Sequence, residues 1–233
     1  MAKSGQLREL HADMQLNKRS KTEDKQIALV IHDVCEEVAR EFGVVIAFEK
    51  KVFLKDIIKS LKEIFPSVGF AYPEVEQSFM SPDGGVVYMV SNAGEKYPIL
   101  ISEVKNQGTN DLRKAEGLKK QAKGNAVERL GKNVIGFRAY MLNEGIFPFV
   151  CFGDGCDFDK GSSILDRVLT IAMFGELNVD HTANEGPNGI FNRGSYYFRY
   201  AHWTREEMYD ILLNVARRSV YYYFSKYGDV SFR

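Results

Sequence analysis

Apolar side chains recur at helical spacing in two segments of the first third of the chain. The first segment runs from about residue 24 to Phe42 and is followed by Gly43. The second, about 51 to 65, is followed by Pro66, which cannot continue a helix. In both, the apolar positions fall three or four residues apart and therefore share one face. We expect two amphipathic helices.

The pattern then changes to that of β-strands. Two runs rich in β-branched and aromatic residues, GGVVYMVSN and YPILISEVK, are joined by the turn-forming letters NAGEK. Such a pair is typical of an antiparallel hairpin. The wholly apolar run FPFVCFG predicts a central strand covered on both faces, and SYYFRYAH predicts another strand.

Three further helices are expected in the second half of the chain. One spans about 126 to 143 and one about 163 to 173; the last begins at Thr204, with Glu207 at the spacing of a capping box. A loop rich in Gly and Asn extends to about residue 194. No repeat or linker interrupts the pattern, which predicts one α/β domain: a five-stranded mixed sheet with helices on both faces.

Composition limits the kinds of protein to consider. The 233 residues are 45% hydrophobic and 27% charged, enough for a buried core. Residues 1–25 are polar and predict a flexible arm ahead of a domain over 26–233. We find neither an apolar run of roughly 20 residues, as a membrane span requires, nor a signal-peptide core, so we expect a soluble, cytoplasmic protein.

The cysteines and the net charge argue against two simple assignments. Cys35, Cys151 and Cys156 lack CxxC spacing, so neither a disulfide framework nor a zinc site is expected. The 31 basic and 31 acidic residues give a net charge of zero. Evidence for a nucleic-acid partner must therefore come from local clustering.

Two carboxylates and a lysine are expected to meet at one end of the hairpin. Asp83 opens the first strand, whereas Glu103 and Lys105 lie near the end of the second and share a face because side chains alternate. Carboxylates suit Mg²⁺, which assists phosphodiester cleavage, and a lysine can orient water and bind the phosphate. Taken alone, Glu103 and Lys105 are also consistent with a surface ion pair.

A basic segment follows the hairpin. Residues 113–138 hold eight Lys or Arg and two Glu, an excess of six positive charges that can neutralise phosphates. Within the letters KGNAVER, Asn125 suits an adenine edge, Ala126 a thymine methyl and Arg129 major-groove acceptors. Gly124 lets the backbone approach closely. A solvated basic helix face is the alternative interpretation.

Four motifs in a fixed order carry a resemblance. SPDGG, SEVKNQG, GNAVER and FPFVCFGDGCDF occur in this order, with twenty residues from Asp83 to Glu103. Over about residues 58 to 175 the chain resembles the EcoRI-like restriction endonucleases of the PD-(D/E)xK nuclease superfamily. The resemblance implies the restriction-endonuclease-like fold and a homodimeric type II enzyme of a bacterial restriction–modification system. Such an enzyme needs Mg²⁺ but no nucleotide cofactor, and cuts palindromic double-stranded DNA to leave 5′-phosphate and 3′-hydroxyl ends.

The resemblance also implies roles for the hairpin residues. By matched position, Asp83 and Glu103 would be catalytic metal ligands, and the backbone carbonyl of Val104 would join them. Lys105 would be the catalytic lysine. Two other classes stay open: a DNA-binding protein that has lost hydrolysis on the same scaffold, and a repair or recombination nuclease with the same core.

The GNAVER segment corresponds to the family segment that recognises an AATT core. Asn125 and Arg129 would contact the adenines and Ala126 the thymine side, while Glu128 would support Arg129 across the dimer. Arg167 occupies the position of an arginine that contacts the outer guanine, which favours GAATTC over CAATTG or bare AATT; a helix-surface arginine is the alternative. The implied DNA-binding residues are Lys123, Gly124, Asn125, Ala126, Glu128, Arg129 and Arg167.

The chain departs from the family pattern in three places. It is shorter between Phe70 and Pro82 and between Gly108 and Gly124, and it differs in the 176–194 loop. In the family these regions include arms that embrace DNA.

Overall fold

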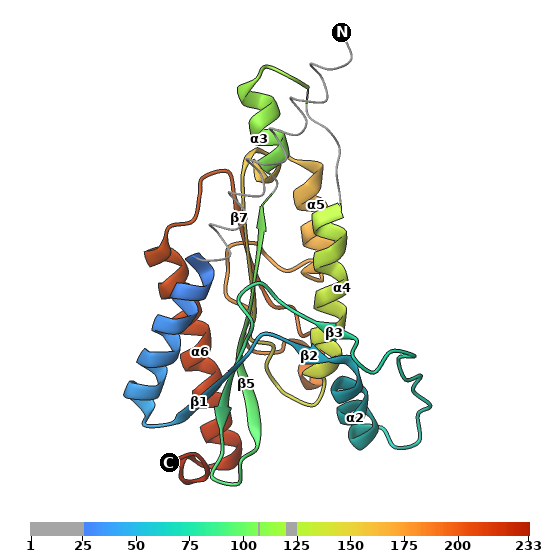
Figure 1. Cartoon of the computed structure of the whole chain (residues 1–233), viewed down its shortest axis with the longest axis vertical. Coiled ribbons are helices and arrows are strands. Elements are labelled where there is room, and N and C mark those ends of the chain that lie inside the picture. The colour runs from blue at the N-terminus through green and yellow to red at the C-terminus, as the bar shows by residue number, and fades with distance from the viewer. Residues whose placement is uncertain (1–25, 107, 120–124) are drawn as a thin grey trace.

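A computed structural model describes residues 26–106, 108–119 and 125–233 (Figure 1). The arm predicted over 1–25 lies outside the described residues. Five strands form one mixed sheet in the order β1-β4-β5-β6-β7. These strands are β1 (Val45–Glu49), β4 (Val86–Val90), β5 (Lys96–Asn106), β6 (Phe149–Asp154) and β7 (Ser195–Arg199). The first three pair antiparallel, and β5, β6 and β7 are parallel, as the predicted α/β class requires.

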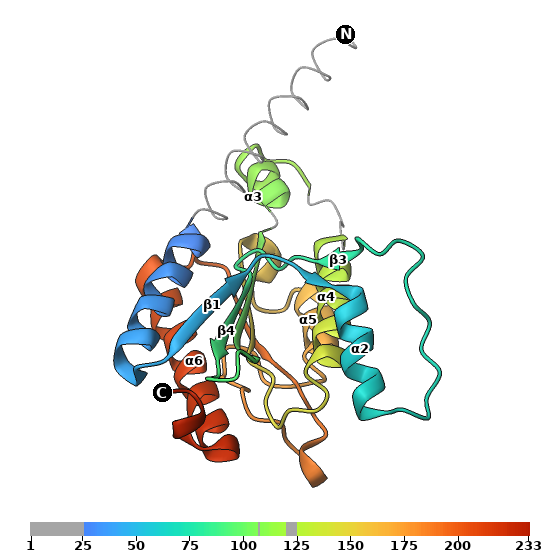
Figure 2. The same cartoon turned by 60° about the horizontal axis from the view of Figure 1, so that its bottom comes forward.

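Helices cover both faces of the sheet (Figures 1 and 2). A helix over 26–42 and α6 (Arg205–Tyr227) lie on one face. On the other lie α2 (Leu54–Ile64), α4 (Asn125–Tyr140) and α5 (Ser163–Ile171), with α4 in contact with the other two. The helix α3 (Gly108–Ala115) follows β5 directly. Short 3-10 helices are η1 (Cys156–Phe158), η2 (Pro187–Gly189) and η3 (Asp229–Ser231).

The helix ends follow the local chemistry of the sequence. Gly43 ends the first helix with a φ of 63°, a conformation that glycine adopts without strain, and its N–H donates to the Ala39 carbonyl at 3.0 Å. At the start of α6, the Thr204 side chain accepts from the Glu207 backbone and the Glu207 side chain from the Thr204 backbone. The predicted capping box is confirmed.

The central strand is buried as its sequence predicts. Residues 149–153 of β6 are all buried, with β5 on one side and β7 on the other. Phe147, Phe149 and Tyr196 form an aromatic group in the core, where the Phe147 and Phe149 rings stack 5.5 Å apart. β6 pairs in parallel with β5, the strand that carries Glu103.

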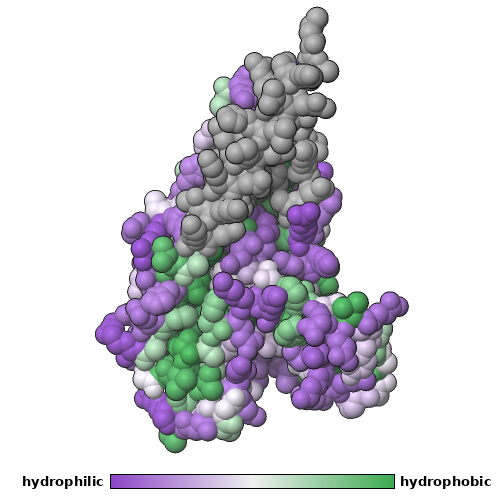
Figure 3. Space-filling view, in the orientation of Figure 1, coloured by the Kyte–Doolittle hydropathy of each residue, from purple (hydrophilic) through white to green (hydrophobic). Residues whose placement is uncertain are grey.

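Two details of the first third differ from the sequence prediction. The helix expected over 51–65 begins only at Leu54, because β2 (Val52–Phe53) pairs instead with β3 (Phe79–Met80). Residues 45–49, for which no strand was predicted, form β1 at the edge of the sheet. Figure 3 shows apolar residues gathered over this strand, where Val45 and Phe48 are exposed. A five-residue edge strand with apolar side chains on both faces gives little periodic signal.

In the described part of the chain, no helix combines the length and the apolar character needed to cross a membrane.

Candidate active site

The segment just before β4 brings Asp83 against β5. The Gly84 N–H donates to the Ser102 carbonyl at 2.9 Å, which continues the hairpin pairing one step beyond β4. A Cβ on Gly84 would lie 1.9 Å from Ser102 Oγ, so the close approach of the two chains depends on this glycine. As a result, Oδ2 of Asp83 accepts from the Val104 N–H at 3.1 Å and from Lys105 Nζ at 3.0 Å. Asp83 therefore meets the end of the second hairpin strand, as the register predicts.

Glu103 and Lys105 share a face of β5 and form an ion pair there. Together with Asp83 they form what we call the carboxylate–lysine cluster. The Glu103 side chain is only 1% exposed and that of Lys105 14%, so this is not the surface ion pair considered from the sequence. Lys105 Nζ also donates to the Val104 carbonyl at 3.2 Å.

The hydrogen bonds of Glu103 are unequal at its two oxygens. Oε1 accepts from Asn133 Nδ2 at 3.0 Å and contacts Lys105 Nζ. Oε2 is buried, yet within the described residues it has no hydrogen-bond partner. A buried carboxylate oxygen without a partner is costly unless a ligand satisfies it.

Burial and charge act in opposite directions on the cluster. Burial raises the pKa of Glu103, as does Asp83, and the opposing effect of Lys105 does not cancel this rise. Burial lowers the pKa of Lys105, but the two carboxylates outweigh it, so the pKa of Lys105 is raised and the ammonium stays charged. Two carboxylates then face one cation, which favours the uptake of further positive charge.

The donors present fit a hard cation such as Mg²⁺. They are carboxylate oxygens and the Val104 carbonyl oxygen, and the unpaired Oε2 of Glu103 is the atom that most needs a ligand. No set of three or more His, Cys, Asp or Glu suited to a metal converges among the described residues. Water or substrate oxygens would therefore have to complete the shell, as is usual for Mg²⁺.

The predicted recognition residues lie on α4 and α5. Asn125 and Ala126 open α4, Glu128 and Arg129 are exposed on its first turns, and Arg167 is exposed on α5. Within the described part of the chain, neither arginine forms an ion pair or a side-chain hydrogen bond. Lys123 and Gly124 lie outside the described residues. The roles assigned to all of these residues stay predictions.

Helices α4 and α5, which carry the predicted recognition residues, are packed together and fixed at their C-terminal ends. Gly131 of α4 faces the Ile171 side chain of α5, and a Cβ at Gly131 would make an ordinary van der Waals contact with it at 3.6 Å. Arg138 Nη2 donates to the Ile171 carbonyl at 2.6 Å and to the Arg193 carbonyl at 2.8 Å. Arg129 and Arg167 therefore stand on one rigid pair of helices.

Sequence reasoning missed the contacts of two asparagines, one of which touches the cluster. Asn133 contacts Glu103 from α4. Asn110, on α3 just beyond β5, donates to both carboxylate oxygens of Asp157 in η1 at 2.8 and 2.7 Å. For Asn133 the only signal was an asparagine inside a predicted helix, where the residue is a weak helix former; no helix was predicted around Asn110. Which residue each one contacts depends on tertiary packing.

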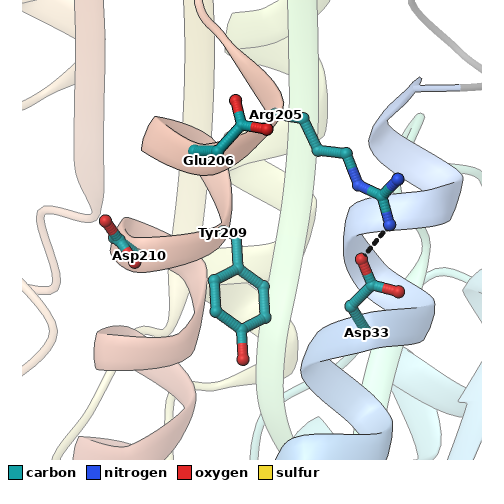
Figure 4. A pocket seen from close by; sticks show the side chains of 5 residues that line it. All are labelled: Asp33, Arg205, Glu206, Tyr209 and Asp210. Atoms are coloured by element: carbon teal, nitrogen blue, oxygen red, sulfur yellow. Dashed lines mark hydrogen bonds and ion pairs between the residues drawn. The ribbon is translucent and has the colours of Figure 1, made fainter.

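A surface pocket of about 410 Å³ lies apart from the cluster (Figure 4). It is formed by the helix over 26–42 and α6, on the face of the sheet opposite α4. An ion pair between Arg205 and Asp33 crosses it. The residues that line it are Asp33, Arg205, Glu206, Tyr209 and Asp210.

Comparison with known proteins places the chain in a family. The family model for restriction endonuclease EcoRI matches residues 11–168, well over half of the chain. The type II restriction enzyme RsrI of Cereibacter sphaeroides is 32% identical over 200 residues, covering 71% of this chain and 72% of RsrI. The type II restriction enzyme EcoRI of Escherichia coli is 27% identical over 200 residues, with the same coverage. The chain therefore belongs to the EcoRI family of type II restriction endonucleases.

Proposed function

We propose that this protein is a Mg²⁺-dependent homodimer that cuts both strands of double-stranded DNA at an AATT-centred palindrome. GAATTC is preferred over CAATTG and bare AATT, and the products carry 5′-phosphate and 3′-hydroxyl ends. The protein acts in the bacterial cytoplasm as part of a restriction–modification system. The observation that carries the proposal is the buried Glu103, whose Oε2 has no protein partner among the described residues, beside Asp83 and Lys105.

The cluster supplies the groups that the cleavage needs. Asp83, Glu103 and the Val104 carbonyl would hold Mg²⁺. When bound, this ion stabilises the charge that develops on the phosphate and makes the attacking water more acidic. Lys105, kept protonated by the two carboxylates, donates to a phosphate oxygen and orients the water. Its ion pairs with Asp83 and Glu103 hold the ammonium in position before DNA arrives.

The recognition residues act on the bases. Arg129 and Arg167 are exposed and uncompensated by any acidic side chain of the described chain, so their donors are free for base edges. Asn125 and Ala126 contact the adenine and thymine of the core, and Glu128 supports Arg129 from the other subunit. Lys123 and Gly124 approach the DNA backbone. A two-fold dimer presents one such set to each half of a palindrome.

Digestion of defined duplexes tests the proposal. Purified protein is incubated with plasmids that carry a single GAATTC, CAATTG or bare AATT site, and the products are sequenced by run-off. We expect Mg²⁺-dependent cutting at GAATTC, with none in EDTA and none by the Asp83→Ala variant. Cuts unrelated to AATT would overturn the proposal.

Specific binding without any product after hours in Mg²⁺ or Mn²⁺ would instead indicate an inactive DNA-binding protein. Sedimentation of the protein–DNA complex tests the dimer.

A further inference from the structure

Asn133 connects the carboxylate–lysine cluster to helix α4. Its Nδ2 donates to Glu103 Oε1 at 3.0 Å, the one hydrogen bond between a described α4 side chain and the cluster. Because Glu103 is only 1% exposed, water has little access to replace this donor. Asparagine is an unfavourable residue inside a helix, so helix formation alone does not account for it at this position.

The hydrogen bond determines which oxygen of Glu103 is left for a ligand. Oε1 is engaged by Asn133 and by Lys105, whereas Oε2 has no partner among the described residues. The terminal torsion of a glutamate is otherwise broad, with little preference of its own. The amide of Asn133 therefore restricts the carboxylate to an orientation that leaves Oε2 available.

Asn133 also belongs to the helix that begins with the recognition residues. Arg129 precedes it by four residues, which is about one helical turn. α4 is continuous from Asn125 to Tyr140, and its C-terminal part is fixed by the hydrogen bonds of Arg138. Arg129 and Asn133 therefore belong to one continuous helix, through which a shift of the first turns on DNA would reach Asn133 and, through its hydrogen bond, Glu103.

We propose that Asn133 is a positioning residue that orients Glu103 and makes this orientation depend on how α4 is seated on DNA. The inference rests on the proposed nuclease function. Groups that orient metal ligands typically contribute about 10- to 100-fold to activity or metal affinity. Loss of the Asn133 amide should lower the cutting rate by this factor at the cognate site. At a site that differs by one base pair, where the contacts of α4 with the bases are incomplete, the rate should fall by a smaller factor.

The first experiment compares two duplexes with enzyme in saturating excess, so that binding does not limit the rate. One duplex carries the site that the wild-type protein cuts, and the other differs by one base pair. In the Asn133→Ala variant we expect the single-turnover rate to fall about 10- to 100-fold on the cognate duplex and less on the altered one. The matched control is Asn214→Ala. This variant also loses a hydrogen bond from an asparagine to a carboxylate, the one that Asn214 Nδ2 donates to Asp180 Oδ2 at 3.0 Å. Asn214 lies on α6, on the face of the sheet opposite α4. Its rates should equal the wild-type rates.

The second experiment measures DNA affinity with and without Ca²⁺, a divalent cation that also prefers oxygen ligands. Without the cation, Asn133→Ala should bind the cognate duplex as tightly as wild type. Its gain in affinity on adding Ca²⁺ should be smaller, because Glu103 is no longer held in place. Thermal unfolding establishes that the variant is folded. If it is not, Asn133→Ser, which keeps a shorter donor, takes its place and should show the same pattern with a smaller loss.

The outcomes separate this inference from the proposed function. A wild-type rate for Asn133→Ala on the cognate duplex would overturn the positioning role alone. An equal fall on both duplexes would overturn its dependence on recognition, since a purely local role affects every complex alike. A wild-type protein that cuts no AATT-centred duplex would overturn the proposed function and this inference together.

Discussion

Glu103 and Glu207 show two ways in which this fold holds a carboxylate. Glu207, at the start of α6, has partners at both oxygens: Arg199 Nη1 donates to Oε1 at 2.8 Å, and the Thr204 N–H donates to Oε2 at 3.0 Å. These partners, Arg199 first, lower the pKa of Glu207 to about 2. Glu103 is buried with Oε2 unpaired in the described structure, and its pKa is raised, chiefly by burial.

The difference predicts a structural role for Glu207 and a functional one for Glu103. Complete pairing stabilises the ionised form in the folded protein, so Glu207 strengthens the fold. Burial without complete pairing has the opposite effect, which makes such a group a candidate for contact with a ligand or a reacting group. The contrast therefore predicts opposite consequences when the two charges are removed.

Removal of the Glu103 charge should have the largest effect. In Glu103→Gln, the rate of cutting of the cognate duplex should fall by about 100- to 1,000-fold, because an amide is a poor ligand for Mg²⁺. Stability without divalent cations should not fall, since the ionised form of Glu103 is disfavoured in the folded state and Asp83 remains beside Lys105. Single-turnover cutting and urea unfolding measure the two quantities. A loss of stability above about 1 kcal/mol would place Glu103 in the structural class.

The sequence contains the information for the carboxylate–lysine cluster because its geometry is local. A hairpin with a short turn brings Asp83 opposite the Glu103 segment, and strand alternation puts Lys105 on the same face as Glu103. The hairpin, the central strand and the capping box at Thr204 follow from patterns within single segments in the same way.

Other features depend on contacts between distant segments. The ribbon of Val52–Phe53 with Phe79–Met80 shortens α2, and no local pattern indicates such a pairing. The burial of Glu103 and its contact with Asn133 require α4 to pack on β5, thirty residues further along the chain. Sequence spacing therefore predicts which residues form the cluster but not how deeply they are buried. Burial is what distinguishes a candidate metal ligand from a surface ion pair.

The next prediction extends the comparison to arginines. Arg129 has no partner in the described chain, whereas Arg217 on α6 donates to Glu41 at 2.7 Å. We expect Arg129→Ala to weaken cognate binding by about 1 to 3 kcal/mol through the loss of base contacts. Arg217→Ala should leave binding unchanged. Titrations with fluorescent cognate and random duplexes measure this, and an equal loss on both duplexes would reassign Arg129 to the phosphate backbone.

The third prediction concerns the backbone that positions Asp83. In Gly84→Ala the new Cβ would meet Ser102 and Ile27, so β4 must move away from β5 or the core must shift. We expect a loss of about 1 to 3 kcal/mol in the free energy of unfolding, together with reduced cutting. Gly69→Ala is the control, because a Cβ there meets nothing within 4 Å. Urea unfolding of both variants measures the free energy that a Cβ costs at this close approach, and equal stability of the two variants would contradict the prediction.

Removal of the Glu207 charge should have the smallest effect, and one that depends on pH. The pKa of Glu207 is about 2 in the folded protein and 4.5 ordinarily, so its ionised form stabilises the fold above pH 4.5. This contribution is lost as the pH falls from 4.5 toward 2. Because the side chain is 41% exposed, solvent screening limits the contribution to about 0.5 to 1 kcal/mol.

Glu207→Gln should therefore be less stable than wild type by this amount at pH 7, while its cutting rate is unchanged. In urea unfolding at pH 7, 5, 4 and 3, the gap between the two proteins should stay constant down to about pH 5 and narrow below 4.5. A gap at pH 3 as large as that at pH 7 would mean that packing of the side chain, rather than its charge, stabilises the start of α6. The contrast in how ionisation of Glu207 and Glu103 affects stability would then not hold.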